Sequence, residues 1–363
     1  MLADHGAEVL KVEAPSGDET RRWGPPFVDD AETTSAYYQG LNRNKFNTVV
    51  DLNSEAGRNL LYELIACADV LVENFKAGTM QRWRLGYERL AKDFPALIYC
   101  RITGYGDDGP LGGLPGYDAV LQAYGGLMSV NGSPGGDPLR VGVPIVDITA
   151  AHQAFSGILL ALLERTLSGR GQLVDIALID AAVSITHPHS AAYLVSGEVP
   201  RRTGAAHPAV APYQVFNTAE DGRLFVAAAT NGQFTALTEV LGRPQLAADV
   251  RFKRNQDRVK NLRALLDELE PLLLRCRADE LAAALTARGV ACGPVNDIAA
   301  ALSAPQVLHR QMVVRDGHYR GIGVPIKLRR SGSIPPRAPS AQGADASSLP
   351  PSWQRRTGLI PSR

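Results

Sequence analysis

The chain has 363 residues, enough for two domains or one large domain with an ample core. Its 38 Lys and Arg against 37 Asp and Glu leave a net charge of +1, so no global field draws it to nucleic acid or membrane. Its four Cys lie in apolar segments without CxxC spacing, which predicts buried thiols in a reducing compartment and no metal site. The sequence shows no uncharged apolar run of about 18 residues and no leader pattern, so a cytoplasmic protein is expected.

In the first half of the chain, short apolar runs alternate with helical patterns. The runs predict strands at 7–14, 47–52, 69–74, 95–102 and 171–178. A helical period at 57–68 lies between the second and third of them. This alternation is typical of a mostly parallel sheet with helical crossovers, so we expect an α/β large domain whose first part is residues 1–195.

The second half of the chain predicts a smaller α+β domain. A polar connector at 196–222 is expected to be a linker. A strand at 223–230 and helices at 233–242, 261–276 and 278–289 then predict a small domain over 223–292. The chain should return to the large domain over 293–330. The tail, 331–363, is rich in Pro, Ser and Ala, and we expect it to be irregular.

Asp147 stands where an apolar run, 141–146, gives way to an amphipathic segment from Ile148 to Leu167. Gly169 follows, a favourable residue just past a helix end. By position alone, Asp147 is most simply an N-cap that accepts a free backbone N–H. An Asp is also ionised at neutral pH, so it can act as a nucleophile without a general base. The two roles are compatible.

Two sequence patterns bear on nucleotide binding. Residues 104–109 satisfy the GxGxxG pattern, but the Pro and Gly residues of 110–116 prevent the helix that a dinucleotide site requires. This segment is better interpreted as a loop that approaches a ligand closely. No Lys follows a Gly, so a phosphate-binding P-loop is absent.

Four stretches resemble the family III CoA-transferases, the group of formyl-CoA and carnitine CoA-transferases. They are 2–15 (LADHGAEVLKVEAP), 42–53 (NRNKFNTVVDLN), 68–87 (ADVLVENFKAGTMQRWRLGY) and 98–184. Within the family, WGPPF, NRNK, ITGYG and APYQVF look most like succinyl-CoA:dicarboxylate transferases. The resemblance implies CoA transfer from succinyl-CoA to a dicarboxylate, with no cofactor beyond the CoA thioester and no metal. It also implies a Rossmann-like large domain and an interlocked homodimer.

The resemblance assigns roles to single residues. Asp147 matches the nucleophile, which forms a mixed anhydride and then carries CoA as an aspartyl thioester. Asp118 matches an active-site carboxylate, although an ordinary turn carboxylate fits equally well. Gly232 lies in Asn231-Gly232-Gln233, which aligns with a glycine-containing loop that covers the nucleophile. The residues expected near CoA are Asn74, Phe75, Arg82, Arg43 and Lys45.

The acceptor acid should meet a further set of side chains. A dicarboxylate needs a cation for its distal carboxylate, because burying that charge unpaired is prohibitive. The candidates for contact with the acid are Tyr117, Arg140, Arg201, Arg202, His207 and Tyr213.

Two alternatives stay open. A 2-methylacyl-CoA racemase of the same fold would carry a His and an acidic residue where this chain has Tyr117 and Asn231, and these supply no second proton carrier at neutral pH. An impaired CoA-binding relative is the other alternative. Members of the family begin with a further strand and a Gly-Pro loop before the equivalent of Met1, and they carry a Leu-Gly-x-His-Thr pattern near the C-terminus, which this chain lacks.

Overall fold

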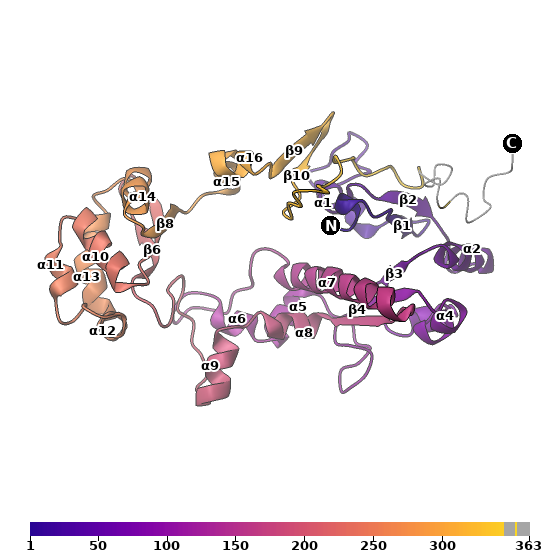
Figure 1. The fold of residues 1–363 in the computed structure, drawn as a ribbon, viewed down its shortest axis with the longest axis horizontal. Coiled ribbons are helices and arrows are strands. Elements are labelled where there is room, and N and C mark those ends of the chain that lie inside the picture. Colours follow the sequence, from indigo (N-terminus) through magenta and orange to yellow (C-terminus); the bar gives the residue numbers. More distant parts are fainter. Residues whose placement is uncertain (345–352, 354–363) are drawn as a thin grey trace. The chain divides into compact units, whose positions relative to one another are not determined.

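The computed structural model describes residues 1–344 and Trp353. The chain folds into two compact units (Figure 1). Unit 1 consists of Met1–Gly125, Gly142–Ile185 and Leu302–Arg363, and unit 2 of Gly126–Val141 and Thr186–Ala301.

Unit 1 is built on parallel strands. β1 (Leu10–Glu13) pairs with β2 (Phe46–Val49), and β4 (Ile98–Thr103) lies between β3 (Val70–Glu73) and β5 (Leu173–Ala177). Buried residues run almost without interruption along β4, as expected for a parallel strand that is covered on both faces. Parallel pairing is therefore as predicted. Among the described residues, however, the strands form two separate sheets and not one.

Short helices connect these strands. The elements of unit 1 besides the strands above are η1 (Ala3–His5), η2 (Glu19–Arg22), α1 (Ala36–Asn42), α2 (Glu55–Ala66), α3 (Thr79–Arg82), α4 (Tyr87–Asp93), α5 (Asp118–Tyr124), α7 (Ile145–Ser168), α8 (Leu178–Ser184), α16 (Pro305–His309) and the antiparallel hairpin of β9 (Val313–Asp316) and β10 (Tyr319–Ile322). The Ser54 hydroxyl caps α2 by accepting from Gly57 N–H.

Helix α7 lies along β4 and β5 (Figure 1). Its buried side chains are spaced by four or three residues and form one apolar stripe against the sheet: Val146, Ala150, Ala154, Ile158 and Ala161. It ends as predicted, because Gly169 takes a left-handed conformation with φ 72°. By length and composition alone α7 could cross a membrane, but a core helix of a soluble protein meets the same criteria.

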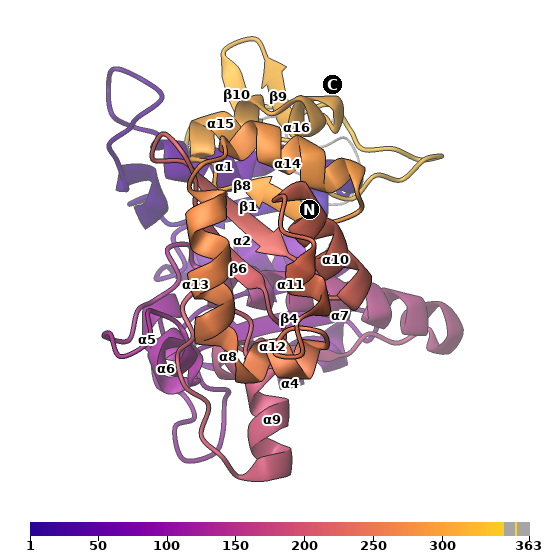
Figure 2. The same cartoon turned by 90° about the vertical axis from the view of Figure 1, so that its left-hand side faces the viewer.

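Unit 2 has an antiparallel sheet of order β6-β7-β8, formed by Tyr213–Asn217, Arg223–Ala227 and Ala291–Pro294. Helices α13 and α14 pack on it, and Figure 2 shows them in front of these strands. Phe216, Leu224, Phe234, Leu265 and Leu285 are among the buried residues of its core. The helices of this unit are α6 (Leu127–Val130), α9 (His189–Ser196), α10 (Asn231–Val240), α11 (Gln245–Ala248), α12 (Asn255–Lys260), α13 (Leu262–Leu273), α14 (Ala278–Ala287) and α15 (Ile298–Ser303), the last of which spans the boundary.

The boundaries of unit 2 differ from those expected for the small domain. Strand β6 lies inside the segment expected to be a linker, 196–222, because it pairs with β7. Strand β8 lies across the expected return at 293 and completes the same sheet. Residues 126–141 also belong to this unit. Strand pairing between segments that are distant in sequence decides these limits.

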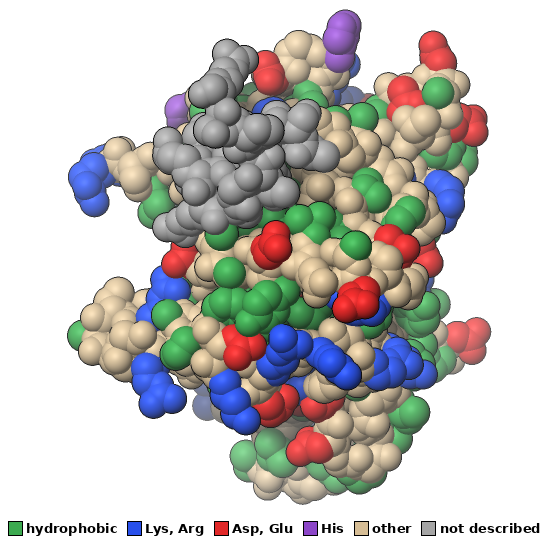
Figure 3. Space-filling view, turned by 90° about the vertical axis from the view of Figure 1, so that its right-hand side faces the viewer, with side chains coloured by type: hydrophobic (Ala, Val, Ile, Leu, Met, Phe, Trp, Pro, Cys, Tyr) green, Lys and Arg blue, Asp and Glu red, His purple; other side chains and the backbone are tan. Residues whose placement is uncertain are grey.

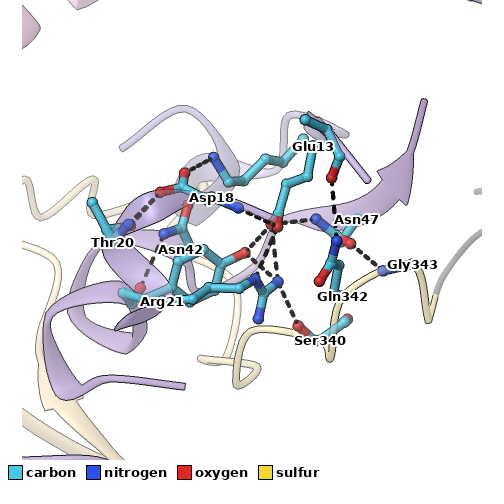
Figure 4. Close-up of polar contacts among 12 residues, drawn as sticks. Glu13, Asp18, Thr20, Arg21, Asn42, Asn47, Ser340, Gln342 and Gly343 are labelled. Atoms are coloured by element: carbon cyan, nitrogen blue, oxygen red, sulfur yellow. Dashed lines mark hydrogen bonds and ion pairs between the residues drawn. The ribbon is translucent and has the colours of Figure 1, made fainter. Parts of the chain in front are cut away.

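The segment Ile334–Gly343 carries no helix or strand, yet it is tied to the first strands of unit 1. Asn44 N–H donates to the Arg337 carbonyl at 3.0 Å, and Gly343 N–H donates to Asn47 Oδ1 at 2.5 Å. Gln342 donates to the carbonyls of Ala14 and Pro15. We call this segment the C-terminal strap (Figure 4).

The C-terminal strap lies beside a buried charge cluster centred on Glu13. The Glu13 carboxylate accepts two hydrogen bonds from Arg21, at 2.8 and 2.9 Å, and one each from Tyr38 and Asn47, both at 2.6 Å (Figure 4). Burial alone would raise the pKa of Glu13, but Arg21 and Tyr38 hold that pKa below its ordinary value. The pairing is what makes a buried carboxylate acceptable here.

Candidate active site

A cavity of about 620 Å³ opens in unit 1 at the carboxyl ends of the parallel strands. It is lined by residues that directly follow β3, β4 and β5: Asn74, Gly104 and Leu178. Ligands of α/β proteins commonly bind at this end of a sheet. The cavity brings together five of the residues predicted for the site, namely Asp147, Asp118, Tyr117, Asn74 and Phe75.

Asp147 is not the N-cap of α7, so the simplest interpretation of its position was wrong. The helix begins at Ile145, three residues earlier than expected, and Asp147 is its third residue. The cap comes from another helix. Asp118, the first residue of α5, accepts from Val146 N–H at 2.8 Å and from Asp147 N–H at 3.3 Å through the same oxygen, Oδ1. Asp118 thus satisfies free N–H groups of α7 and holds Asp147 in place.

The rest of the Asp118 carboxylate is also occupied. Gln122, a fully buried residue one turn along α5, donates to Asp118 Oδ2 at 2.6 Å. With both oxygens engaged, Asp118 is a structural anchor of the site. Among the residues that the structure describes, the oxygens of the Asp147 carboxylate have no hydrogen-bond partner, and Asp147 lines the cavity.

The environment of Asp147 acts against its ionisation. Burial and then the negative charge of Asp118 raise the pKa of Asp147 above its ordinary value. The start of a helix stabilises a carboxylate by only about 0.3–1 kcal/mol, which does not offset these two effects. The charged carboxylate is therefore destabilised. Acylation removes this charge, so the destabilisation favours a carboxylate that acts as a nucleophile.

Three side chains of the cavity wall were not predicted as site residues, namely Trp23, Tyr37 and Leu41. Tyr37 and Leu41 lie one turn apart on α1. Trp23 packs edge-on against Tyr37 with ring centroids 5.2 Å apart. Burial, followed by the charges of Asp147 and Asp118, raises the pKa of Tyr37, so its hydroxyl keeps its proton and can donate. The motif WGPPF, which begins with Trp23, indicated a family resemblance but not that Trp23 lines a cavity. The only sequence signal that groups Tyr37 with Leu41 is their helical spacing of four residues.

The turn after β3 is fixed by a buried acid. Glu73 accepts from Phe75 N–H at 2.8 Å and from the Tyr99 hydroxyl at 3.3 Å. Burial raises the pKa of Glu73. Its hydrogen bonds hold Asn74 and Phe75, which are exposed at the cavity.

The glycine-rich loop after β4 forms another part of the wall. A Cβ on Gly104 would lie 2.6 Å from the Gly116 backbone nitrogen, so the two backbone segments touch. Contact within the chain therefore requires glycine at both positions. Gly104, Gly113 and Gly116 also line the cavity, and the close approach of this loop to a ligand stays a prediction. Arg101 holds the loop through Asp107 at 2.7 Å and also pairs with Asp175 of β5 at 3.1 Å.

The three basic residues predicted for CoA binding lie in unit 1 but do not line this cavity. Arg43 is committed to Asp4 by hydrogen bonds of 2.8 and 3.0 Å. Arg82 is exposed and donates to Thr79 in its own helix. Lys45 donates to Asn42 Oδ1 at 2.9 Å, and burial, then the charge of Lys11, lowers the pKa of Lys45 to about 8.

The residues predicted to meet the acceptor acid, apart from Tyr117, lie in unit 2. Arg202 is committed to backbone carbonyls, those of Gly136 at 2.6 Å and Ser129 at 3.3 Å. Arg140 and Arg201 are exposed. His207 and Tyr213 form an edge-on pair with centroids 5.2 Å apart, and His207 Nδ1 accepts from Ala209 N–H.

Gly232 lies in a helix and not in a loop. Asn231, Gly232 and Gln233 form the first turn of α10, where Thr230 and Gln233 complete a capping box. A Cβ on Gly232 would meet nothing closer than Thr230 Oγ1 at 4.0 Å, and its φ is not positive. Local packing does not explain a glycine at this exposed position.

The structure is that of an α/β protein with a cavity at the carboxyl ends of its parallel strands. Aromatic side chains line the cavity, and Asp118 holds Asp147 in it. Among the residues that the structure describes, no group of three or more His, Cys, Asp and Glu could hold a metal ion.

Comparison with known proteins agrees with this description. The sequence model of CoA-transferase family III matches residues 1–346. A succinate–glutarate CoA-transferase of Agrobacterium fabrum is 40% identical over 318 residues, which cover 86% of this chain and 79% of the relative. The human succinyl-CoA:glutarate CoA-transferase is 38% identical over 318 residues, 87% of this chain and 72% of the relative.

A solved structure shares the fold. A CAIB/BAIF family protein from Brucella suis superposes with a TM-score of 0.87 at 38% identity, covering 97% of this chain and 93% of that chain. The chain belongs to CoA-transferase family III.

Proposed function

We propose that the protein transfers CoA from succinyl-CoA to a dicarboxylic acid, with Asp147 as the nucleophile. The observation that carries the proposal is the carboxylate of Asp147, which lines the cavity and whose backbone is held there by Asp118. The relatives named for succinate–glutarate and succinyl-CoA:glutarate transfer support the substrate class.

The transfer takes four steps in this proposal. The Asp147 carboxylate attacks the succinyl thioester carbon and releases CoA thiolate, which leaves a mixed anhydride. The thiolate then attacks the aspartyl carbonyl, giving an aspartyl-CoA thioester and free succinate. The acceptor carboxylate attacks this thioester and forms a second anhydride with release of the thiolate. Finally the thiolate attacks the acceptor acyl carbon and regenerates Asp147. No cofactor other than the CoA thioester takes part.

Side chains of the cavity support these steps. The Tyr37 hydroxyl, protonated because of its raised pKa, is placed to donate a hydrogen bond near the two carboxylates. Asn74 and Phe75 present an amide and an aromatic ring for the CoA ester. By resemblance, Gly232 at the start of α10 in unit 2 stays a candidate for the catalytic set.

We further propose that the active form is a homodimer. The exposed leucines of α7 support this proposal. Figure 3 shows one face on which hydrophobic side chains form a band beside charged ones.

On α7, three leucines on the side away from its buried stripe are candidates for this interface. Leu160, Leu163 and Leu167 are 67%, 64% and 87% exposed. Their spacing of three and four residues places them on one helical face.

A thioester-exchange assay with purified protein, succinyl-CoA and a panel of acids tests the activity. Glutarate or a related dicarboxylate should exceed formate and acetate by at least about a hundred-fold in kcat/KM, because a site made for a charged group rejects acids that lack it. Equal use of formate and glutarate would reject the dicarboxylate assignment.

The role of Asp147 is tested by Asp147→Asn and Asp147→Ala, which should abolish transfer in folded protein. Hydroxylamine should trap wild-type enzyme only in the presence of acyl-CoA, on the peptide that contains Asp147. A folded Asp147→Ala variant that keeps more than a few per cent of the wild-type rate would remove Asp147 from the mechanism.

A further inference from the structure

Gln122 of helix α5 is a polar side chain in an apolar part of unit 1. It is fully buried, and its neighbour Leu121 belongs to the apolar core that α5, α7 and α8 form together. A buried amide is costly unless it is hydrogen-bonded, and an apolar side chain of similar size would avoid that cost. The amide of Gln122 therefore calls for an explanation.

The amide fixes the carboxylate that caps α7. Gln122 Nε2 donates to Asp118 Oδ2 at 2.6 Å, and Asp118 Oδ1 accepts from Val146 N–H at 2.8 Å and from Asp147 N–H at 3.3 Å. Pro144, the residue before α7, has no side chain that could accept from these N–H groups. Because both oxygens of Asp118 are engaged, rotation of its carboxylate would break at least one of these bonds.

Packing fixes the backbone of α5 without the amide. A Cβ on Gly125, just past the end of α5, would lie 2.6 Å from Ala182 Cβ, so the end of α5 is in close contact with α8. Leu121 is fully buried in the same core. These contacts hold the helix in place, and they leave to Gln122 the orientation of the Asp118 side chain.

We infer that Gln122 is a positioning residue for CoA transfer, which acts on Asp147 through the carboxylate of Asp118. The inference rests on the proposed function, in which Asp147 is the nucleophile. In the part of the chain that the structure describes, Gln122 is not among the residues that line the cavity, so it acts without touching substrate. It holds the Asp118 carboxylate, which in turn holds the backbone of Asp147 at the cavity.

Gln122→Leu tests the inference, because it removes the donor and places an apolar side chain of similar size in the core. Misplacement of a reacting group by about 1 Å can cost about a hundred-fold, so kcat should fall at least about ten-fold. KM for succinyl-CoA should change less than about two-fold, since no substrate contact is lost. Gln153→Leu is the matched control: the amide of Gln153 donates to Ser184 Oγ at 3.1 Å, and its loss should leave kcat unchanged.

Gln122→Glu separates the donor from the shape of the side chain. A protonated carboxyl can donate to Asp118 as the amide does, whereas an ionised carboxylate cannot donate and repels Asp118. Burial and the adjacent charge of Asp118 favour the protonated form. Relative to wild type at the same pH, kcat should therefore exceed that of Gln122→Leu at about pH 6 and fall toward about pH 9. Equal kcat of the two variants at every pH would overturn the inference.

A double variant shows whether Gln122 acts through Asp118. In the Asp118→Ala background the hydrogen bond is already lost, so Gln122→Leu should lower kcat further by less than about two-fold. A loss of about ten-fold in both backgrounds would mean that Gln122 acts independently of Asp118, and this would overturn the inference.

Hydrogen exchange gives a readout that does not depend on activity. The amides of Val146 and Asp147 should exchange faster in Gln122→Leu, while those of the buried residues Ala154 and Ile158 of α7 stay protected. Wild-type protein that transfers no CoA would reject the proposed function. Unchanged exchange at Val146 and Asp147, in a protein whose wild-type form is active, would reject the role of Gln122 alone.

Discussion

At the scale of single residues, the site depends on two carboxylates whose charges oppose each other. Asp118 has to accept hydrogen bonds from the start of α7, yet its negative charge raises the pKa of Asp147. The first function needs only an acceptor oxygen, whereas the second needs the charge. The two can therefore be separated by substitution.

Asp118→Asn keeps an acceptor oxygen for Val146 and Asp147 N–H and removes the charge. The pKa of Asp147 should fall, so the acid limb of the kcat/KM profile should move to lower pH while activity at neutral pH changes little. Asp118→Ala should instead lower activity at all pH values, because it leaves these N–H groups without their cap, at a cost of about 1–2 kcal/mol. Steady-state pH profiles with succinyl-CoA check both, and an unshifted acid limb in Asp118→Asn would contradict the assignment.

Lys45 offers a second pH-dependent test. Its pKa of about 8 means that it is a cation below that pH and neutral above it. If Lys45 meets a phosphate of CoA, the dissociation constant of CoA should rise by up to about ten-fold as pH increases through 8. Lys45→Arg should remove this dependence, because arginine stays charged.

The control for Lys45 is Lys11, whose charge contributes to lowering the pKa of Lys45. Lys11→Met should move the rise in the dissociation constant to higher pH. Titration calorimetry with CoA between pH 6.5 and about 9.5 measures both effects. Affinity that is independent of pH in the wild-type protein would place Lys45 away from the nucleotide.

At the scale of elements, the first turn of helix α10 contains Gly232, although neither its backbone conformation nor its packing requires a glycine. Gly232→Ala should raise the stability of the protein by up to about 1 kcal/mol, since Ala favours the helix and its Cβ has open space. If Gly232 approaches the substrate, the same substitution should lower kcat/KM. Thermal unfolding and the exchange assay measure the two effects. A variant with higher stability and full activity would exclude Gly232 from the site.

The sequence predicted what depends on neighbouring residues. The end of α7 was predicted because Gly169 can take the left-handed conformation by itself. The start of α7 was misplaced because its cap, Asp118, lies 28 residues before Val146. Likewise, buried apolar runs predicted the strands of unit 1, but nothing local indicated that β1 and β2 would form a sheet of their own.

The same limit applies to the site. Resemblance to a known family assigned Asn74, Phe75, Tyr117, Asp118 and Asp147 to the site. All five line one cavity, and their roles stay predictions. The sequence could not predict whether a basic side chain is available to a ligand or is already hydrogen-bonded within the protein. Arg43 and Arg202 are held by groups far away in sequence, Asp4 and the Gly136 carbonyl, which no motif indicates.

At the scale of the whole molecule, the exposed leucines of α7, Leu160, Leu163 and Leu167, predict association. Light scattering should give twice the chain mass of 38.9 kDa at micromolar concentration. Leu163→Glu, which places a charge in the exposed stripe of α7, should shift the protein toward monomer and lower activity in parallel. Leu308→Glu, at an exposed leucine of α16, is the control and should stay dimeric. A monomeric, fully active wild-type protein would contradict the proposal.

The C-terminal strap sets the order in which the protein can fold during its synthesis. Ala14 and its partner Gln342 are separated by 328 positions, so at about 5–20 residues per second the first strand waits for about 16–66 s. Unit 2 ends at Ala301 and has all its residues available earlier. The unit that contains the first residues of the chain is therefore the last to be completed on the ribosome.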